Sequence, residues 1–325
     1  MNRLILTVAL LAGSLPLNVD TNPAPQQLFL IAERQANLFQ DQSSPFQFDA
    51  DFVVQMDFPT QGHLSMKWGA NDRWWSKVEM GHFEQVNIRN GEKSYTSRNV
   101  PFTPVRIGEV FNLINFVKGF EDKTAKKLKH RAENGVDLSC LQVERQQAMG
   151  EPHEVCLDST THEILSEEWR EQPDERRREE FTDYANFGGN RYPRKLQLQV
   201  NGSRVVTIQV NSLAASPLDE AFLVPPKGAV ERRKCANMKN AMQLKTPDPL
   251  YPKSASKNRL MGDSTVAMTV LTDGSVSDIQ LIGRATESMD EATLQTLRSW
   301  RFKPAMCGAD PVVSDIVVVV SFRLE

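Results

Sequence analysis

The sequence has few cysteines, little net charge and no apolar run long enough to cross a membrane as a helix. Its 325 residues include 4 cysteines and 5 histidines, and the formal net charge is −3, with a pI near 6.0. A chain without a marked positive charge lacks the electrostatic footprint of a nucleic-acid-binding protein, so we expect no nucleic-acid partner. The length is typical of about two domains, each large enough to bury a core.

The usual motifs of enzymes are also missing. There is no Gly-x-Ser-x-Gly elbow, phosphate-binding loop or dinucleotide fingerprint. Neither metal-ligand spacing nor a nearby nucleophile accompanies the five histidines, which are His63, His82, His130, His153 and His162. No closely spaced cysteine pair indicates zinc. We therefore expect no enzymatic activity, no cofactor and no metal site.

The N-terminal residues are typical of an exported protein. Arg3 precedes an apolar run over residues 4–17, which Gly13 and Pro16 interrupt. A membrane-spanning helix needs about 20 apolar residues, so this run fits the apolar part of a signal sequence better. We assign residues 1–25 to a signal peptide or, if the leader is not cleaved, a signal anchor.

The cysteines agree with export, because an oxidising compartment favours disulfides. Four cysteines allow three pairings. Cys140 and Cys156 lie in two short β-like runs joined by a polar turn, so they can face each other across a hairpin. Cys235 precedes the last part of the chain, and Cys307 lies in its final loop. We predict the pairs Cys140–Cys156 and Cys235–Cys307, against the alternatives of zinc ligands or buried free thiols.

The last part of the chain, residues 249–325, has the pattern of a small αββαβ unit, which we call the C-terminal module. Residues 264–271 and 275–282 alternate polar and apolar side chains, and the pair Asp273-Gly274 between them suits a hairpin turn. Residues 287–300 change to helical spacing, and Pro304 follows. A valine-rich run closes the chain and is too β-branched for a helix.

Several motifs of this module resemble the TonB C-terminal domain family. They are Pro-Leu-Tyr-Pro at residues 249–252, the Asp-Gly turn, Trp-Arg-Phe-Lys-Pro-Ala at residues 300–305, and the closing valine-rich strand. The resemblance implies a periplasmic domain that binds an extended segment of an outer-membrane transporter, or of another envelope protein, by adding it as a strand to a sheet edge. It implies a link to transmembrane transport. It places the edge on Val313, Asp315, Ile316, Val317, Val318, Val319, Val320 and Phe322.

The remaining residues, 26–224, read as an antiparallel meander. An amphipathic helix is expected near residues 25–40 and an apolar helix near residues 105–120, with strand-like runs and polar turns between and after them. The segment at residues 225–248 contains several prolines and reads as a linker. We therefore predict an α+β chain: a curved antiparallel sheet, or half-barrel, with helices on its concave side, followed by the small αββαβ domain.

That order of elements resembles LolA-like periplasmic lipoprotein- or lipid-binding half-barrels. The residues that carry the resemblance are Gly62, Leu64, Lys67 and Trp68, with Arg73, Trp74 and Trp75 on the next strand. The resemblance implies a cavity for lipid or for the acyl chains of a lipoprotein, whereas an ordinary solid core is the competing interpretation. Candidate lining residues are Phe52, Val54, Met56, Leu64, Met66, Trp68, Trp75, Phe111 and Ile114.

Two hypotheses of function follow from these patterns. In the first, the chain is an envelope interaction protein of the TonB type. In the second, it is a periplasmic carrier of lipid or lipoprotein. The valine-rich edge also permits a homodimer through the last strand. The charged run at residues 171–180 is expected to be a solvated loop or strand edge, and the basic run at residues 123–131 a polar strand at a sheet edge.

Overall fold

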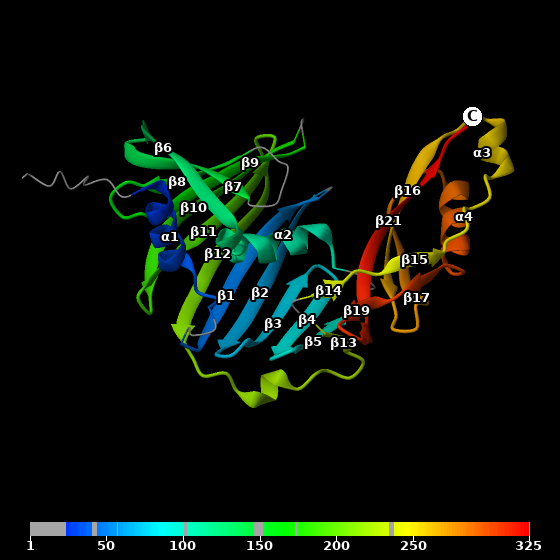
Figure 1. Cartoon of the computed structure of the whole chain (residues 1–325), viewed down its shortest axis with the longest axis horizontal. Helices are drawn as coiled ribbons and strands as arrows, with labels where there is room; N and C mark the ends of the chain where they lie inside the picture. The colour runs from blue at the N-terminus through cyan, green and yellow to red at the C-terminus, as the bar shows by residue number, and fades with distance from the viewer. Residues whose placement is uncertain are drawn as a thin grey trace, which may run out of the picture.

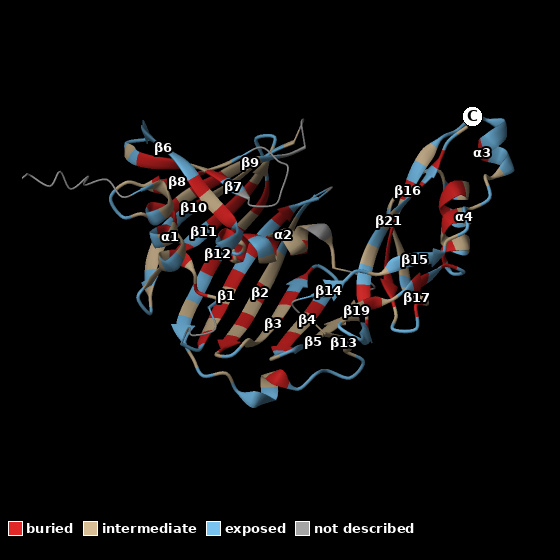
Figure 2. Ribbon diagram, viewed as in Figure 1, coloured by how far each residue is buried: buried red, intermediate tan, exposed pale blue. Residues whose placement is uncertain are grey.

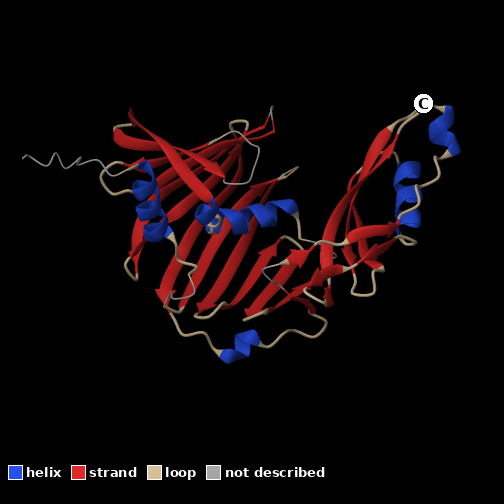
Figure 3. Cartoon of the chain, viewed as in Figure 1, coloured by secondary structure: helices blue, strands red, loops and turns tan. Residues whose placement is uncertain are grey.

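The protein consists of a large curved sheet and a small module beside it, joined by a segment that pairs with both (Figure 1). The computed structural model describes residues 24–40, 44–56, 58–100, 103–145, 152–172, 175–233 and 237–324. The predicted signal segment, apart from its last two residues, lies outside these ranges. Strands dominate both parts, and short helices lie against them (Figure 3).

Thirteen strands of the described residues form the large sheet, and every pair is antiparallel. In chain order they are β1 (Phe46–Gln55), β2 (Pro59–Gly69), β3 (Arg73–Met80), β4 (Phe83–Asn90), β5 (Lys93–Arg98), β6 (Lys123–Glu133), β7 (Val136–Arg145), β8 (His153–Asp158), β9 (Ile164–Gln172), β10 (Glu175–Phe187), β11 (Asn190–Val200), β12 (Ser203–Ala215) and β13 (Val230–Arg233). Their order across the sheet is β13-β5-β4-β3-β2-β1-β12-β11-β10-β9-β8-β7-β6. The predicted meander is confirmed, and β6 is the edge strand that the basic run was expected to form.

Two helices lie against the concave side of this sheet (Figure 1). Helix α1 (Pro25–Ala36) directs Leu28, Phe29 and Ala32 to the core, and α2 (Val105–Ile114) packs across β11 and β12. The ring of Phe29 stacks on Phe120 of the short 3-10 turn η1 (Phe120–Asp122) at a centroid distance of 4.7 Å. The sheet supplies alternate residues of each strand to the same core, as its period of two requires.

A short segment that contains a 3-10 turn packs against the convex side of the sheet. The 3-10 turn η2 (Glu220–Leu223) contacts β3 and β4 from that side, and the ring of its Phe222 lies 5.0 Å from the ring of Trp75. Arg73 of β3 forms an ion pair with Glu220. The segment around η2 thus closes the first domain before the chain turns toward the second.

The module contains a three-stranded sheet with α4 on one face. Its elements are α3 (Lys253–Lys257), β16 (Gly262–Val270), β17 (Val276–Gly283), α4 (Glu287–Leu297), β18 (Arg301–Lys303), β19 (Ala305–Cys307), β20 (Asp310–Val312) and β21 (Ser314–Phe322). The strand order is β17-β16-β21. Met289 and Leu297 of α4 are fully buried against Val266, Met268 and Val270 of β16. The predicted αββαβ arrangement is confirmed.

The segment predicted as a linker, residues 225–248, carries three short strands instead. β13 extends the large sheet by pairing with β5, whereas β14 (Met238–Lys239) and β15 (Met242–Lys245) pair with β19 and β18 of the module. The segment therefore connects the two domains through main-chain hydrogen bonds on both sides.

One predicted disulfide is confirmed. Cys140 of β7 and Cys156 of β8 are direct cross-strand neighbours and are bonded to each other. Cys307 is also disulfide-bonded. Its predicted partner, Cys235, lies outside the described residues.

Gly274 is required by the hairpin turn of the module. Its φ is +79°, and a Cβ at this position would lie 2.0 Å from the carbonyl oxygen of Phe302. The Gly274 carbonyl also accepts a hydrogen bond from the Phe302 N–H at 2.9 Å. We expect Gly274→Ala to lower the free energy of unfolding, measured in urea, by about 2–5 kcal/mol, because left-handed strain and a main-chain collision add.

The matched control is Gly228→Ala. Gly228 has a similar φ of +83°, but no atom lies within 4 Å of its Cβ position. Only the conformational cost of about 1–2 kcal/mol applies there. Equal losses for the two variants would contradict the role assigned to the contact with Phe302.

Candidate functional site

The strand β21 forms one edge of the module sheet. It pairs with β16 along its whole length, from Ser314 opposite Val270 to Phe322 opposite Gly262. On its other side, no strand of the described residues pairs with it. Half of the backbone N–H and C=O groups of β21 therefore point away from the sheet. Of the eight residues that the sequence assigned to this edge, seven lie on β21, and Val313 immediately precedes it.

The side chains of β21 divide between two faces. Val320 and Phe322 belong to the module core, and Ile316 and Val318 pack against it. Val317 and Val319 are 61% and 60% exposed, on the face opposite α4. The alternation of exposed and buried residues along β21 is visible in Figure 2. The apolar side chains of this strand thus serve both as core and as surface.

The first residues of β21 are held by the large domain. The carboxylate of Asp315 accepts hydrogen bonds from Nη2 of Arg232 (β13) at 2.9 and 3.0 Å and from the hydroxyl of Thr269 (β16) at 2.7 Å. Nη2 of Arg98 (β5) lies 3.5 Å from the same carboxylate. A second ion pair joins Arg233 to Asp310. Four strands of two domains therefore meet at the beginning of the open edge.

Most of the residues predicted to line a cavity are buried in the hydrophobic core of the large domain. Phe111 packs against that core from α2 as a partly buried residue. The predicted lining residues that are buried members of this core are Phe52, Val54, Leu64, Met66, Trp68 and Ile114. Their lining of a cavity for acyl chains stays a prediction.

Two residues of that prediction are wrong. Trp75 lies on the convex face against Phe222, and its neighbour Trp74 is the residue that packs against the core. The reason is strand alternation, because Trp74 is in phase with the buried Val78 and Met80. Met56 follows the last residue of β1 and is 46% exposed.

A buried ion pair lies on the same face as this core. The Nζ atom of Lys123 (β6) is 2.6 Å from Oε1 of Glu167 (β9), and both side chains are 5% exposed. Nδ1 of His153 (β8) lies 2.5 Å from the same oxygen. Burial by itself would raise the pKa of Glu167, but the hydrogen bond with His153 and the charge of Lys123 hold that pKa below its ordinary value.

Further charges on β10 face the same side. Arg177 forms ion pairs with Glu109 of α2 and with Glu175, and its guanidinium lies 6.0 Å from the centre of the Trp169 ring. The contact between Arg177 and Glu109 ties α2 to the sheet. The sequence had assigned residues 171–180 to a solvated segment. This assignment is wrong for Arg177, whose phase with the fully buried Phe181 was the available signal.

Glu179 lies directly opposite Glu167 in the register of β9 and β10. Loss of hydration and then the Glu167 carboxylate raise the pKa of Glu179 from 4.5 to about 8. Between these values the unfolded chain releases a proton that the folded chain keeps, so stability falls as the pH rises through this window. In Glu179→Gln the side chain cannot ionise, so this fall in stability with rising pH is removed. We expect the variant to be more stable than wild type at pH about 9, with a small difference at pH about 5.

Urea unfolding at the two pH values measures this effect. Glu180→Gln is the control, because Glu180 lies on the other face of β10 and pairs with Arg178. An equal change for Glu179→Gln at both pH values would contradict the protonated state of the folded carboxyl.

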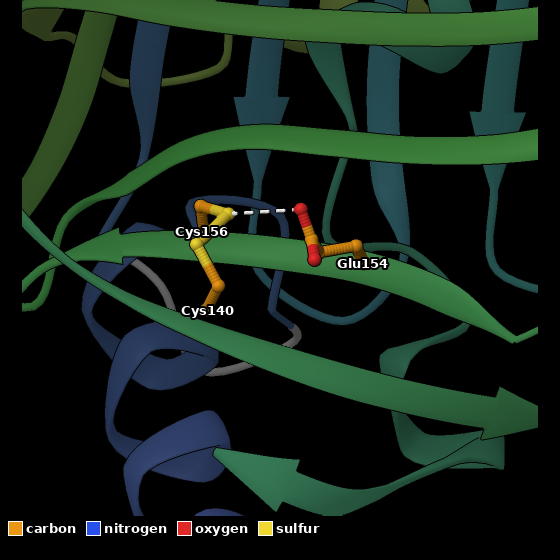
Figure 4. A group of neighbouring side chains, drawn as sticks. All are labelled: Cys140, Glu154 and Cys156. Carbon is orange, nitrogen blue, oxygen red and sulfur yellow. Dashed lines mark hydrogen bonds between the residues drawn. A yellow bond between two sulfur atoms is a disulfide. The ribbon is translucent and has the colours of Figure 1, made fainter. Parts of the chain in front are cut away.

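In the described residues, one group of side chains has the spacing of metal ligands: Cys140, Glu154 and Cys156 (Figure 4). The two sulfur atoms are bonded to each other, and Arg131 forms an ion pair with Glu154 at 2.9 Å. Neither cysteine is a thiolate in this arrangement, so the group does not offer the ligands that zinc needs.

No helix in the described part of the chain has both the length and the apolar character needed to span a bilayer. The comparison with family models concerns the module. Residues 247–324 match the family described as Gram-negative bacterial TonB protein C-terminal. The C-terminal module is thus similar to the TonB C-terminal domain. The resemblance inferred from its motifs is confirmed.

Curated relatives match the same region. Protein TonB of Pseudomonas aeruginosa is 29% identical over 83 residues, which are 25% of this chain and 24% of that protein. Protein TonB of Klebsiella aerogenes is 33% identical over 83 residues, which are 25% of this chain and 32% of that protein. The matched region therefore spans about a quarter to a third of these relatives.

Among solved structures, a LolA superfamily protein of Nitrosomonas europaea is similar to the chain with a TM-score of 0.45 and 8% identity. The superposition covers 62% of this chain and 98% of that one.

Proposed function

We propose that this chain is an envelope interaction protein of the TonB type. In this proposal it works in the periplasm, where the C-terminal module binds an extended segment of an outer-membrane transporter or of another envelope protein, and the binding serves transmembrane transport. The chain acts by binding and not by catalysis. The family match of residues 247–324 supports the class of partner.

The observation that carries the proposal is the open edge of β21. An added strand gains main-chain hydrogen bonds there, and these hydrogen bonds supply affinity without demanding a particular sequence. The exposed Val317 and Val319 next to the edge offer apolar cross-strand contacts on one face, which favour β-branched residues in the added segment. The nine residues of β21 are long enough for several such pairs.

The proposal is tested by calorimetric titration of the full chain with peptides from the periplasmic N-termini of the organism's outer-membrane transporters. We expect saturable binding of at least one of them. The matched controls are two versions of the same peptide, one methylated at the odd and one at the even backbone nitrogens, because only one of these sets faces β21 in an added strand. Equal binding of all three peptides, or binding of none, would contradict strand addition.

A second copy of the chain can compete for the same edge. Sedimentation of the protein with and without peptide separates the two cases. If a dimer forms through β21, the peptide that binds should dissociate it. A dimer that persists at saturating peptide concentration uses another surface.

A further inference from the structure

The large sheet ends in a second open edge, strand β6. In the order of the sheet, β6 is the last strand, at the opposite end from β13, which continues into the module (Figure 1). It pairs with β7 on one side, and none of the described strands pairs with its other side. At 11 residues it is longer than β21. A row of unpaired N–H and C=O groups is a template for another strand, and natural proteins usually cover or protect it.

The protein covers only the first part of this edge. Helix α1 packs against β6, and Oε1 of Gln26 accepts a hydrogen bond from the backbone N–H of Ala125 at 2.7 Å. That N–H therefore points away from β7, and a side chain takes the place that a neighbouring strand would fill. After a bulge at Lys126, the pairing with β7 is regular over residues 127–133. Within the described ranges, the backbone of residues 127–133 has hydrogen bonds to β7 only.

Three lysines lie on the uncovered part of the edge or next to it. Lys126, Lys127 and Lys129 are exposed, and none of them forms an ion pair with another described residue. The residues opposite Lys127 and Lys129 on β7 are Gln142 and Cys140, which carry no charge. Since residues two apart on a strand share a face, the charges of Lys127 and Lys129 stand side by side. The edge is therefore positively charged on one face.

The strand is held firmly from behind. Cys140 of β7 is bonded to Cys156 of β8, so the two strands next to the edge cannot separate. Leu128 packs against the core of the large domain on the other face of β6, and Arg131 forms an ion pair with Glu154 of β8 at 2.9 Å. A strand that is already ordered loses little conformational entropy when another segment pairs with it.

The charge of the edge selects the kind of strand that can pair with it. Lysines on an edge strand disfavour pairing with a basic segment, and they disfavour pairing of two copies of β6, because like charges would then lie on the same face. An acidic segment gains instead, since its carboxylates lie beside the lysines while its backbone fills the open hydrogen-bond positions.

We propose that β6 is a second strand-binding edge, which takes an extended acidic segment of a partner protein. The segment carries Asp or Glu at every second position, on the face of Lys127 and Lys129. The site belongs to the large domain, at the end of the sheet away from the module, and does not depend on the edge of β21.

The test uses the full chain and synthetic peptides of 11 residues, the length of β6. One peptide alternates Thr with Glu, and the reference peptide alternates Thr with Gln. We expect the Glu peptide to bind at least about tenfold more tightly in fluorescence anisotropy, and this ratio to fall as the salt concentration rises. Equal affinity of the two peptides, or no binding of the Glu peptide, would overturn the inference.

Variants assign the binding to β6. Lys127→Gln and Lys129→Gln should each weaken binding of the Glu peptide by about threefold or more, and the double variant should remove most of its advantage. The matched control is Lys195→Gln, because Lys195 is exposed on β11, which has a paired strand on both sides. It should bind as wild type does. An equal loss in Lys195→Gln would assign the binding to general surface charge and overturn the inference.

Methylated peptides separate strand addition from charge attraction alone. Two further Glu peptides carry methyl groups on the odd or on the even backbone nitrogens, and only one of these sets faces β6 in an added strand. One version should therefore lose affinity strongly, whereas equal binding of all three Glu peptides would overturn strand addition at β6. Binding to phosphatidylglycerol vesicles that the lysine variants abolish, without binding of any peptide, would assign this face to a lipid surface instead.

The two edges are tested separately. The variants at Lys127 and Lys129 should leave the affinity of a transporter peptide for β21 unchanged, because the two lysines lie in the other domain. Failure of the acidic peptides would overturn the inference on β6 and leave the proposed function in place.

Discussion

Glu167→Leu is expected to lower the free energy of unfolding by about 3–5 kcal/mol, because it leaves Lys123 as a buried charge without its partner. The two groups are 2.6 Å apart, and both side chains are almost inaccessible to solvent. The cost of an uncompensated buried ammonium far exceeds the value of the added apolar surface. Urea unfolding measures the change.

The double variant Lys123→Met/Glu167→Leu tests this explanation. Replacing a whole buried pair by apolar residues is often close to neutral, so the double variant should be more stable than Glu167→Leu alone. The exposed pair Lys77–Glu79 supplies the control, since Glu79→Leu should change stability by less than about 1 kcal/mol. The single variant Lys123→Met is measured as well. If the double variant loses as much stability as the two single variants lose together, the buried-charge explanation is contradicted.

The second large effect concerns binding. Neighbouring residues of an edge strand direct their N–H groups alternately to the paired strand and to solvent. Of Val317→Pro and Val318→Pro, one therefore removes a hydrogen bond to β16 and the other removes a donor from the open edge. We expect the second of these to keep its stability within about 1 kcal/mol and to lose at least about tenfold in peptide affinity.

The control for this pair is Val317→Ala, which retains the backbone donor and removes much of an exposed side chain. It should lose less peptide affinity than the proline variant that removes the open-edge donor, because it removes a side-chain contact and keeps the main-chain hydrogen bond. If both proline variants fold and bind as wild type does, β21 is not the edge to which the partner is added.

The local patterns were sufficient for most of the fold. The hairpin of β16 and β17 follows from alternation and from the turn at Asp273-Gly274, and α4 follows from its change of period. In both cases the information lies within about twenty consecutive residues. The disulfide between Cys140 and Cys156 was accessible for the same reason, because the two cysteines lie on consecutive strands.

The short strands that join the two domains could not be predicted from local patterns. β13 has four residues and β14 has two, and each forms because a partner far along the chain, β5 or β19, offers an edge. Such short runs carry no periodicity of their own, and the prolines and charges of residues 225–248 favoured a linker. The tertiary pairing decided the structure of this segment.

The charges at the candidate site were missed for a related reason. Asp315 interrupts an apolar run, and a sequence cannot tell that Arg98 and Arg232, which lie far from it in the chain, meet it in the fold. Lys123 and Glu167 are likewise 44 residues apart. Alternation did contain one usable signal, since Trp74 and not Trp75 is in phase with Val78 and Met80.

The most direct measurement of strand addition is a titration of the isotope-labelled full chain with a transporter peptide, followed through backbone amide shifts. We predict saturable shifts concentrated on residues 313–322, with smaller changes on β16 and at Arg98 and Arg232. Shifts confined to the concave face of the large domain, or no shifts with any peptide, would contradict the claim that the open edge of β21 is the binding site.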